Sequence, residues 1–447
     1  MRFARKILTK LEAWKASEQG GCAYLIEGAR RVGKSFIAED FAKRHYRSYL
    51  LLNFSIVAPE VKALFVQEAS NLDRFFSHLQ AMTGVQLFVR ESLIIFDEVQ
   101  LFPKARELIK FLVADGRYDY LETGSLLSLK QNVESIVIPS EEEHVAMHPM
   151  GFDEYLAARG EEAMLTAIRE AFEARQPMGA LHRRAMVLFR EYLILGGMPQ
   201  VLEKFLPEQD FEAADRVKRR ILALYREDIR KFAGRYAERV SRLFEEIPAQ
   251  LCKKEKTYRL SRVERGAKFR SYENAFVWLG ESMIVNNVFN ATDPTSVGIA
   301  LSQEFTTRKI YFADTGLLVT AVLANGEETN QALYTQLLTG NLAINEGMFM
   351  ENVVAQMLRA SGKRLFFYSR RDPATHRPEI EIDFLIQRGE RICPIEVKSG
   401  NYRSHTSLDK FRQRFGKAIG EPIILYPKDL MLRDGILHLP LYMAMCL

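Results

Sequence analysis

The sequence, 447 residues long, predicts an α/β protein in which a parallel sheet precedes a helical region and a second set of strands. Three observations support this fold class. Strand-length apolar runs alternate with helical patterns up to residue 125, which is typical of a parallel sheet covered by helices on both faces. The pattern is almost wholly helical between residues 151 and 232, and strand-like alternation returns between residues 364 and 398.

The composition is that of an ordinary globular protein, with 47% hydrophobic and 27% charged residues, and it excludes long disordered segments. The length predicts about three domains. A net charge of +5 permits binding to nucleic acid without requiring it. Four scattered cysteines indicate a reducing compartment, and neither a membrane-spanning run nor a signal peptide is recognisable. We therefore expect a cytoplasmic protein with no membrane partner.

The first motif with chemical meaning is the phosphate-loop pattern Gly28-Ala29-Arg30-Arg31-Val32-Gly33-Lys34-Ser35. An apolar run of strand length precedes it, and apolar residues at helical spacing follow it. A glycine-bearing turn between a strand and a helix points backbone N–H groups, and the positive end of the helix, at a phosphate. Lys34 would reach the β and γ phosphates, and the Ser35 hydroxyl would hold Mg²⁺. The loop residues expected at the nucleotide are Gly28, Arg30, Gly33, Lys34 and Ser35.

Two carboxylates end the apolar run Ser92-Leu93-Ile94-Ile95-Phe96-Asp97-Glu98. Asp97 would hold the magnesium through water, and Glu98 would polarise the water that attacks the γ phosphate. Ligands of such sheets bind beyond the carboxyl ends of the strands. We therefore expect Thr123 or Ser125, at the end of the next strand, to contact the γ phosphate or the attacking water; a plain turn is the alternative. These residues together predict hydrolysis of a nucleoside triphosphate.

The helical region is interrupted by Gly196-Gly197-Met198-Pro199, where two glycines before a proline end a helix. A helical lid is the structure expected after a phosphate-loop sheet. Arg226 or Arg230 could reach a nucleotide from this lid, although most arginines on such helices are simply solvated. His144 and His148 have the spacing of two metal ligands on a helix, but their neighbours favour the end of a strand.

Residues 252–270 carry the densest charge of the chain, with eight Lys or Arg against two glutamates. A helical pattern over 273–280 and a strand over 283–289 follow. Short basic helices before a strand hairpin fit a winged helix, whose recognition helix enters the major groove of double-stranded DNA. The alternatives are a solvated charged face and a surface that contacts another part of the same chain.

The last 110 or so residues predict another α/β unit. A helix is expected from about 342 to 360, followed by strands over 364–369, 379–387 and 391–398. Strand alternation places Asp383 on the face opposite its apolar neighbours. On the next strand, Glu396 and Lys398 share one face, so the two carboxylates and the ammonium are expected together.

This spacing matches the PD-(D/E)xK nuclease signature, in which a helical glutamate precedes an aspartate and an E-x-K sequence on adjacent strands. Asp383 and Glu396 could hold a second Mg²⁺, and Lys398 could orient and help deprotonate an attacking water. Glu351 on the preceding helix would complete the metal ligands, and Glu346 is the less favoured choice. The alternative is an acidic and basic cluster that is only structural.

With these motifs, nearly the whole chain resembles a prokaryotic family of AAA-like P-loop ATPases that carry a helical lid, a winged helix and a C-terminal domain of unknown function with a nuclease-like fold. The resemblance rests on Gly28–Ser35, Phe96–Glu98, Thr123–Ser125, His148–Tyr155, Gly196–Pro199, Tyr311–Leu317, Met350–Asn352, Ile382-Asp383 and Ile395–Gly400. It implies ATP as the nucleotide, a cytoplasmic ATPase, and roles in DNA transactions or defence.

Four domains are expected: an ATPase domain over 1–160, a lid over 161–235, a winged helix over 236–328, and a restriction-endonuclease-like α/β domain over 329–447. The expected function is that of an ATPase, with ATP and Mg²⁺ as cofactors, whose nucleotide state controls binding and metal-dependent cleavage of DNA. The alternative is a nucleotide-operated switch that binds DNA or a protein without cutting. Homo-oligomerisation stays open, because no motif places an arginine that acts in trans.

Overall fold

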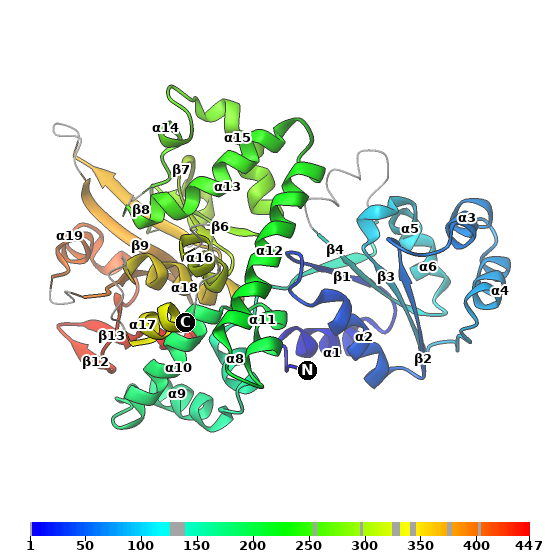
Figure 1. Ribbon diagram of the computed structural model, residues 1–447, viewed down its shortest axis with the longest axis horizontal. Coiled ribbons are helices and arrows are strands. Elements are labelled where there is room, and N and C mark those ends of the chain that lie inside the picture. The colour runs from blue at the N-terminus through cyan, green and yellow to red at the C-terminus, as the bar shows by residue number, and fades with distance from the viewer. Residues whose placement is uncertain are drawn as a thin grey trace. The chain divides into compact units, whose positions relative to one another are not determined.

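The computed structural model describes residues 2–125, 139–253, 257–295, 298–323, 331–339, 346–372, 378–400 and 404–447. The chain forms two compact units (Figure 1). The N-terminal unit comprises Ala4–His148 together with Glu281–Met283. The C-terminal unit comprises Pro149–Gly280 and Ile284–Leu447, with Phe3 and its neighbours.

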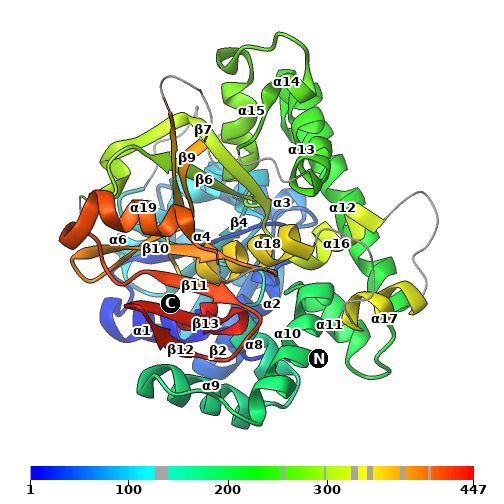
Figure 2. The same ribbon diagram turned by 90° about the vertical axis from the view of Figure 1, so that its left-hand side faces the viewer.

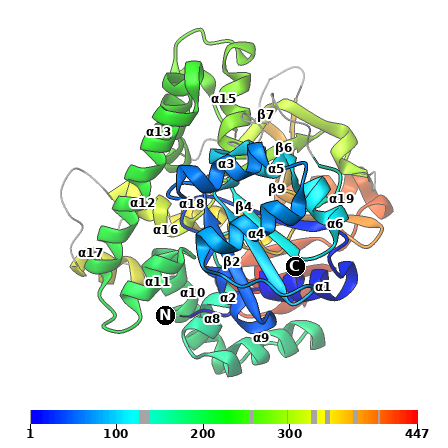
Figure 3. The same cartoon turned by 90° about the vertical axis from the view of Figure 1, so that its right-hand side faces the viewer.

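The N-terminal unit is built on a five-stranded sheet in the order β2-β3-β4-β1-β5, and every strand pair is parallel. The predicted parallel sheet is therefore confirmed. Its elements, shown in blue to cyan in Figure 3, are α1 (Ile7–Glu18), β1 (Ala23–Glu27), α2 (Lys34–His45), β2 (Ser48–Asn53), α3 (Pro59–Gln67), α4 (Leu72–Thr83), β3 (Ser92–Asp97), α5 (Pro103–Glu107), α6 (Ile109–Asp115), β4 (Asp119–Gly124) and β5 (Glu142–Ala146).

Helices cover both faces of this sheet. One face, which includes Leu25 and Phe96, packs in a single apolar cluster with side chains from α3, α4, α5 and α6. On the other face, Trp14 of α1 stacks on Tyr24 of β1 with ring centroids 5.4 Å apart, and it also contacts Phe41 of α2. Because both faces are buried, β1 and β3 are mainly apolar, which is the pattern that predicted them, whereas β5 at the edge of the sheet is largely polar and exposed.

The C-terminal unit begins with helices and continues into an eight-stranded sheet (Figure 2). Its helices are α8 (Phe152–Ala158), α9 (Glu162–Ala174), α10 (Leu181–Leu195), α11 (Pro199–Phe205), α12 (Phe211–Phe232), α13 (Ala237–Cys252), α14 (Leu260–Val263), α15 (Phe269–Glu281), α16 (Thr315–Leu323), α17 (Gln331–Thr339), α18 (Glu346–Ala360) and α19 (Thr406–Phe415). Its strands are β6 (Val285–Ala291), β7 (Gln303–Phe312), β8 (Phe366–Arg371), β9 (Pro378–Arg388), β10 (Arg391–Val397), β11 (Ile423–Tyr426), β12 (Met431–Arg433) and β13 (Ile436–Pro440).

The larger sheet crosses the domain boundary expected at residues 328 and 329. Its order is β12-β13-β11-β10-β9-β8-β6-β7, so the hairpin assigned to the winged helix and the strands assigned to the nuclease-like domain share one sheet. The junction is short, because Phe289 and Asn290 of β6 pair in parallel with Phe366 and Phe367 of β8. Local patterns predict each strand but do not reveal pairing between strands so far apart in sequence.

A buried aspartate, Asp314, joins the glycine break after α10 to the start of α16. Its carboxylate accepts hydrogen bonds from the backbone N–H groups of Gly197 (2.6 Å) and Leu317 (3.0 Å). A Cβ at position 197 would lie only 2.1 Å from the Met150 carbonyl oxygen, so the chain approaches too closely for any side chain. Burial raises the pKa of Asp314 to about 6. The signatures Gly196–Pro199 and Tyr311–Leu317 are thus joined by a hydrogen bond between Gly197 and Asp314.

We expect Asp314→Ala to destabilise the C-terminal unit, because the Gly197 and Leu317 amides lose their acceptor in the core. Each buried amide left without an acceptor costs about 1–3 kcal/mol. Calorimetric unfolding of the full chain should show a transition several degrees lower than in the wild type. The control is Glu227→Ala on an exposed position of α12, which should change little. An Asp314→Ala protein as stable as this control would contradict the role of the carboxylate.

Candidate functional site

The phosphate loop lies between β1 and α2, at the carboxyl end of β1. Gly33 is the residue before α2 and has φ 101°, a conformation that favours glycine. Gly28 is confined for a different reason, since a Cβ there would lie 2.4 Å from the Met147 carbonyl oxygen. The ammonium of buried Lys34 donates to the carbonyls of Gly28 (2.9 Å) and Ala29 (3.2 Å). The loop therefore wraps around a positive charge at a helix N-terminus.

Oxygen-bearing side chains from α2 and three strand ends converge beside the loop. The Ser35 hydroxyl donates to Asp97 Oδ1 at 2.6 Å, and the Thr123 hydroxyl donates to the same oxygen. Asn53, the last residue of β2, donates its amide to Asp97 Oδ2 at 2.7 Å. Hydroxyl, carboxylate and amide oxygens are the ligands that Mg²⁺ prefers, so this set fits a magnesium ion beside the phosphates.

Glu98 sits directly after β3 with φ 55°, the left-handed region that is strained for a residue other than glycine. Its backbone N–H donates to the Thr123 hydroxyl at 3.4 Å. Its carboxylate accepts a hydrogen bond from the side-chain amide of Gln100. Neighbouring polar groups thus hold both the backbone and the side chain of the expected catalytic glutamate.

Sequence reasoning missed three residues of this site: Asn53, Gln100 and Arg5. Arg5 donates to the carbonyl of Val32 in the loop (2.8 Å) and to that of His148 (2.7 Å), so it ties the loop to the end of β5. Asn53 is the last residue of β2 and lies at the carboxyl edge of the sheet, where ligands bind, so a polar residue near the end of this apolar run was a usable signal. No local pattern points to Arg5, which lies far from the loop in sequence.

The other residues expected to contact the nucleotide are not among the side chains that converge on Asp97. Arg30 is exposed on the loop, and Ser125 follows β4 directly in a half-buried position. Arg226 binds Glu245 of α13 through two hydrogen bonds of 2.6 and 3.1 Å, and Arg230 is exposed near the end of α12. Arg226 is thus engaged inside the C-terminal unit.

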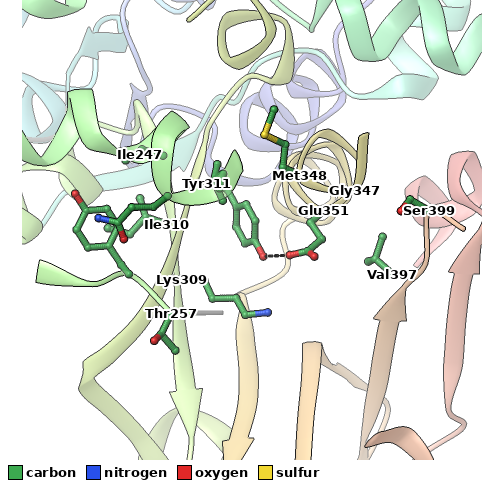
Figure 4. Close-up of a pocket in the computed structure, with 13 residues that line it drawn as sticks. Ile247, Thr257, Lys309, Ile310, Tyr311, Gly347, Met348, Glu351, Val397 and Ser399 are labelled. Atoms are coloured by element: carbon green, nitrogen blue, oxygen red, sulfur yellow. Dashed lines mark hydrogen bonds between the residues drawn. The ribbon is translucent and has the colours of Figure 1, made fainter. Parts of the chain in front are cut away.

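The acidic cluster of the C-terminal unit is formed by Asp383 on β9, Glu396 on β10 and Glu351 on α18. Strands β9 and β10 are antiparallel neighbours, and the Val397 N–H donates to Asp383 Oδ2 at 3.0 Å. Lys398 lies 2.8 Å from Glu396 Oε2. Burial raises the pKa of Glu396. Glu351 accepts from the Tyr311 hydroxyl at 2.8 Å, as Figure 4 shows. Glu346 is the first residue of α18.

Sequence reasoning did not foresee Lys309 of β7, which enters this cluster. Its ammonium lies 3.1 Å from Asp383 Oδ1 and 3.4 Å from Glu381 Oε1, and the residue is 5% exposed. Burial alone would lower the pKa of Lys309, but Asp383, Glu351 and Glu381 raise it above its usual value. The Lys309 ammonium already contacts Asp383 Oδ1, the carboxylate expected to bind the second Mg²⁺. This arrangement therefore does not fit a second Mg²⁺ at Asp383. Among the described residues, no group of three or more His, Cys, Asp or Glu is arranged to hold a metal.

A cavity of about 160 Å³ borders this cluster. Lys309, Tyr311 and Glu351 form part of its wall, and Ser399 lies at its side (Figure 4). Thr257 and Tyr258, which belong to the basic segment over 252–270, also line it. The cavity therefore joins the acidic cluster to the start of the basic segment.

The basic segment, residues 252–270, spans the end of α13, the short helix α14 and the start of α15. Residues 254–256 lie outside the described part. One of the two glutamates, Glu264, accepts from the Tyr272 hydroxyl at 2.6 Å and lies 3.9 Å from Arg242. The basic side chains that the structure describes here are all exposed: Lys253, Arg259, Arg262, Arg265, Lys268 and Arg270. The order of helices α13, α14 and α15 before the β6–β7 hairpin is the one expected of a winged helix, whose assignment stays a prediction.

Family models match three parts of the chain. Residues 21–156 match the model described as AAA domain. This part of the chain is therefore similar to an AAA domain, and we refer to it by that name. The expected P-loop ATPase fold is thereby confirmed, together with its parallel sheet. Residues 186–329 and 346–442 match two domains of unknown function, DUF8612 and DUF4143. Neither description names a winged helix or a nuclease, so both assignments stay predictions.

Among solved structures, the chain is similar to a STAND (signal transduction ATPase with numerous domains) protein from Pyrococcus horikoshii, with 12% identity and a TM-score of 0.26; the match covers 78% of this chain but only 47% of that protein. It is also similar to a chain in the structure of Drosophila ORC bound to DNA, with 13% identity and a TM-score of 0.27; the match covers 75% of this chain and 95% of that one. The similarity to Cdc6p from Pyrobaculum aerophilum has 14% identity and a TM-score of 0.25, and it covers 75% of this chain and 94% of Cdc6p. TM-scores this low do not establish a shared fold or function. No curated protein matches the chain.

None of the described helices is long and apolar enough to cross a bilayer.

A group of charged side chains lies beside β1, the strand that leads into the loop; Glu27 and Arg106 are buried, whereas the His144 side chain is 42% exposed. His144 of β5 bonds Glu27 of β1 (2.9 Å) and Glu142 of β5 (2.7 Å). Arg106 of α5 binds the same Glu142 through two hydrogen bonds of 2.9 and 2.5 Å. Burial raises the pKa of Glu122, a neighbour of this group, well above its usual value. His144 therefore acts as an ion-pair partner on a strand, and the helical metal pair with His148 is not formed.

We expect the thermal stability of the AAA domain to fall as the pH rises from about 6.5 to about 9. The hydrogen bonds to Glu142 and Glu27 raise the pKa of His144 from 6.5 to about 9. The stabilisation is complete below the unfolded pKa and is lost as the pH rises through the folded one. Calorimetry at pH 6.5 and pH 9 should show a larger loss for the wild type than for His144→Gln.

His78→Gln is the control, because it removes a histidine of the same unit that lies on α4, outside this cluster. It should lose as much stability as the wild type over this pH interval. If His144→Gln shows the same loss as His78→Gln, the ion pairs of His144 do not stabilise the domain.

Proposed function

We propose that this chain is a Mg-ATP-dependent ATPase whose nucleotide state is coupled to the binding of double-stranded DNA. The observation that carries the ATPase part is the convergence of Ser35, Asn53 and Thr123 on the Asp97 carboxylate beside the phosphate loop. A buried lysine and this oxygen-rich corner are the two components that a triphosphate with magnesium requires. The AAA domain supports the same conclusion.

Each residue has a distinct task in this proposal. The loop amides and Lys34 bind the β and γ phosphates, and Ser35 with Asp97 would hold the magnesium. When bound, Mg²⁺ neutralises charge that develops on the phosphate oxygens. Glu98 polarises the attacking water, and Gln100, which bonds its carboxylate, fixes the direction in which it points. Thr123 joins Asp97 to the Glu98 backbone, so it positions both acids together.

ATP turnover should be lost in Lys34→Ala and reduced about 10²- to 10⁴-fold in Glu98→Gln, because a positioned acid or base contributes a factor of that size. Release of phosphate by the purified full chain measures this. Thr123→Val should also lower kcat strongly, whereas Ser125→Ala, two residues further on, serves as the matched control with a small effect. Normal turnover in Lys34→Ala or Glu98→Gln would disprove the site, and equal effects of the Thr123 and Ser125 changes would disprove the role of Thr123.

The basic segment supports the DNA part of the proposal. Six described lysines and arginines in it are exposed, and Glu264, one of its two acids, is engaged by Tyr272 and Arg242. Basic side chains on short helices bind the phosphates of DNA without reading its sequence. A stretch of positive charge on one segment, in a chain with a net charge of only +5, favours a specific polyanionic partner.

The affinity for a DNA duplex should fall steeply with salt and should weaken when Lys253, Arg265 and Lys268 are changed to alanine. Each phosphate contact contributes roughly 0.9 to the slope of log affinity against log salt, so the slope should decrease by about 2–3. Fluorescence anisotropy measures this, with and without ATP and in Glu98→Gln. The control changes three exposed basic residues elsewhere in the C-terminal unit: Arg183, Lys204 and Lys428.

Loss of affinity in the control alone would contradict the assignment of the DNA surface to 252–270. An affinity that ATP does not change would contradict the coupling, while leaving the ATPase proposal intact.

The sequence also suggests metal-dependent DNA cleavage by the acidic cluster, with Asp383, Glu396 and Lys398 as its catalytic residues. One observation favours the alternative, a nucleotide-operated switch that does not cut. It is the contact of the Lys309 ammonium with Asp383, the carboxylate expected to hold the metal. We therefore propose DNA binding without cleavage.

A further inference from the structure

We infer that Lys309 is a built-in cation that takes the place of a divalent metal ion in the nuclease-like cluster, so that the wild-type cluster binds no metal. This inference concerns the C-terminal unit alone and does not depend on the proposed ATPase. Its starting point is that the ammonium lies 3.1 Å from Asp383 and 3.4 Å from Glu381.

The position of Lys309 is not a chance contact of a flexible surface side chain. The residue is 5% exposed, and its ammonium lies 5.4 Å from the centre of the Phe367 ring. A buried ammonium is very costly unless carboxylates and other hydrogen-bond partners compensate it. The carboxylates of Asp383 and Glu381 therefore compensate the buried charge of Lys309, and Lys309 compensates theirs.

The other polar groups of the cluster also have partners from the protein. The second oxygen of Asp383 accepts from the Val397 N–H, and Lys398 lies against Glu396. Glu351 accepts from Tyr311, the residue two positions after Lys309 on β7. A magnesium ion needs about six oxygens at about 2.1 Å in a near-octahedral arrangement. It would have to displace these donors and stand beside an ammonium of the same charge sign.

The path of β7 explains how the lysine reaches the cluster. In the order of the sheet, β6 and β8 separate β7 from β9, yet the Tyr311 ring packs 5.7 Å from the ring of Phe384 on β9. The pairing of β6 with β8 is confined to Phe289 and Asn290. Lys309 and Tyr311 of β7 therefore contact Asp383 and Phe384 of β9 directly, although the two strands are not neighbours in the sheet.

The test uses Mn²⁺, whose binding to the full chain without nucleotide is followed by electron paramagnetic resonance. Four proteins are compared: wild type, Lys309→Met, Lys309→Met with Asp383→Asn, and Lys218→Met. Lys218 is the matched control, because it is also a fully buried lysine of the C-terminal unit, and it donates to the Ile194 carbonyl at 3.0 Å. Circular dichroism establishes that each protein is folded.

We expect Lys309→Met to gain one Mn²⁺ site, because the carboxylates that held the ammonium then face each other without a cation. Addition of Asp383→Asn should weaken that site about 10- to 100-fold or abolish it. Wild type and Lys218→Met should not show it. A folded Lys309→Met protein that binds no more Mn²⁺ than wild type would overturn the inference.

A second comparison needs no Lys309 variant and so remains decisive if Lys309→Met does not fold. Wild type, Asp383→Asn and Lys398→Ala are incubated with linear, circular and single-stranded DNA and Mg²⁺ or Mn²⁺, with and without ATP. We expect no cleavage by any of them, and no Mn²⁺ binding in wild type that Asp383→Asn removes. Cleavage by wild type that Lys398→Ala abolishes, or Mn²⁺ binding that depends on Asp383, would overturn the inference.

Discussion

The candidate ATPase site depends on one carboxylate, that of Asp97. It accepts hydrogen bonds from α2 through Ser35, from β2 through Asn53 and from β4 through Thr123. Because the same Thr123 hydroxyl accepts from the Glu98 backbone, a shift of one strand end also changes the position of Glu98, the glutamate proposed to be catalytic. A buried carboxylate with this many donors is a rigid reference point, since each donor would lose its partner if the carboxylate turned away.

Much of this site was predictable from the sequence, because its components are local. A phosphate loop is eight consecutive residues, and the strand that carries Asp97 and Glu98 is recognisable from its apolar run. Asn53, Gln100 and Arg5 were not predicted. Gln100 follows Glu98 by two residues, but nothing in the sequence shows that the chain turns back after β3. Arg5 reaches the loop only after α1 has packed on the sheet.

For the acidic cluster, the sequence predicted the carboxylates but not the cation that determines their chemistry. Asp383, Glu396 and Lys398 lie on or beside two neighbouring strands, as strand alternation suggested, and Glu351 on α18 lines the adjacent cavity. The chemistry of the cluster nevertheless rests on Lys309, which lies in a strand assigned to a different domain. A pattern can place carboxylates on one face of a strand. It cannot reveal a cation that arrives from a segment 74 residues earlier.

The contacts of β7 with the later strand β9 also set the order in which parts of this unit can fold. During synthesis, β7 leaves the ribosome 74 residues ahead of Asp383, so its lysine must stay hydrated until β9 has been made. The small contact of β6 with β8 likewise waits for the later strand. The C-terminal unit thus closes late, by contacts between distant segments, and such topologies fold slowly. A nascent chain that stops before β9 would leave the apolar side of β7 open, and it would be a natural target for chaperones or proteases.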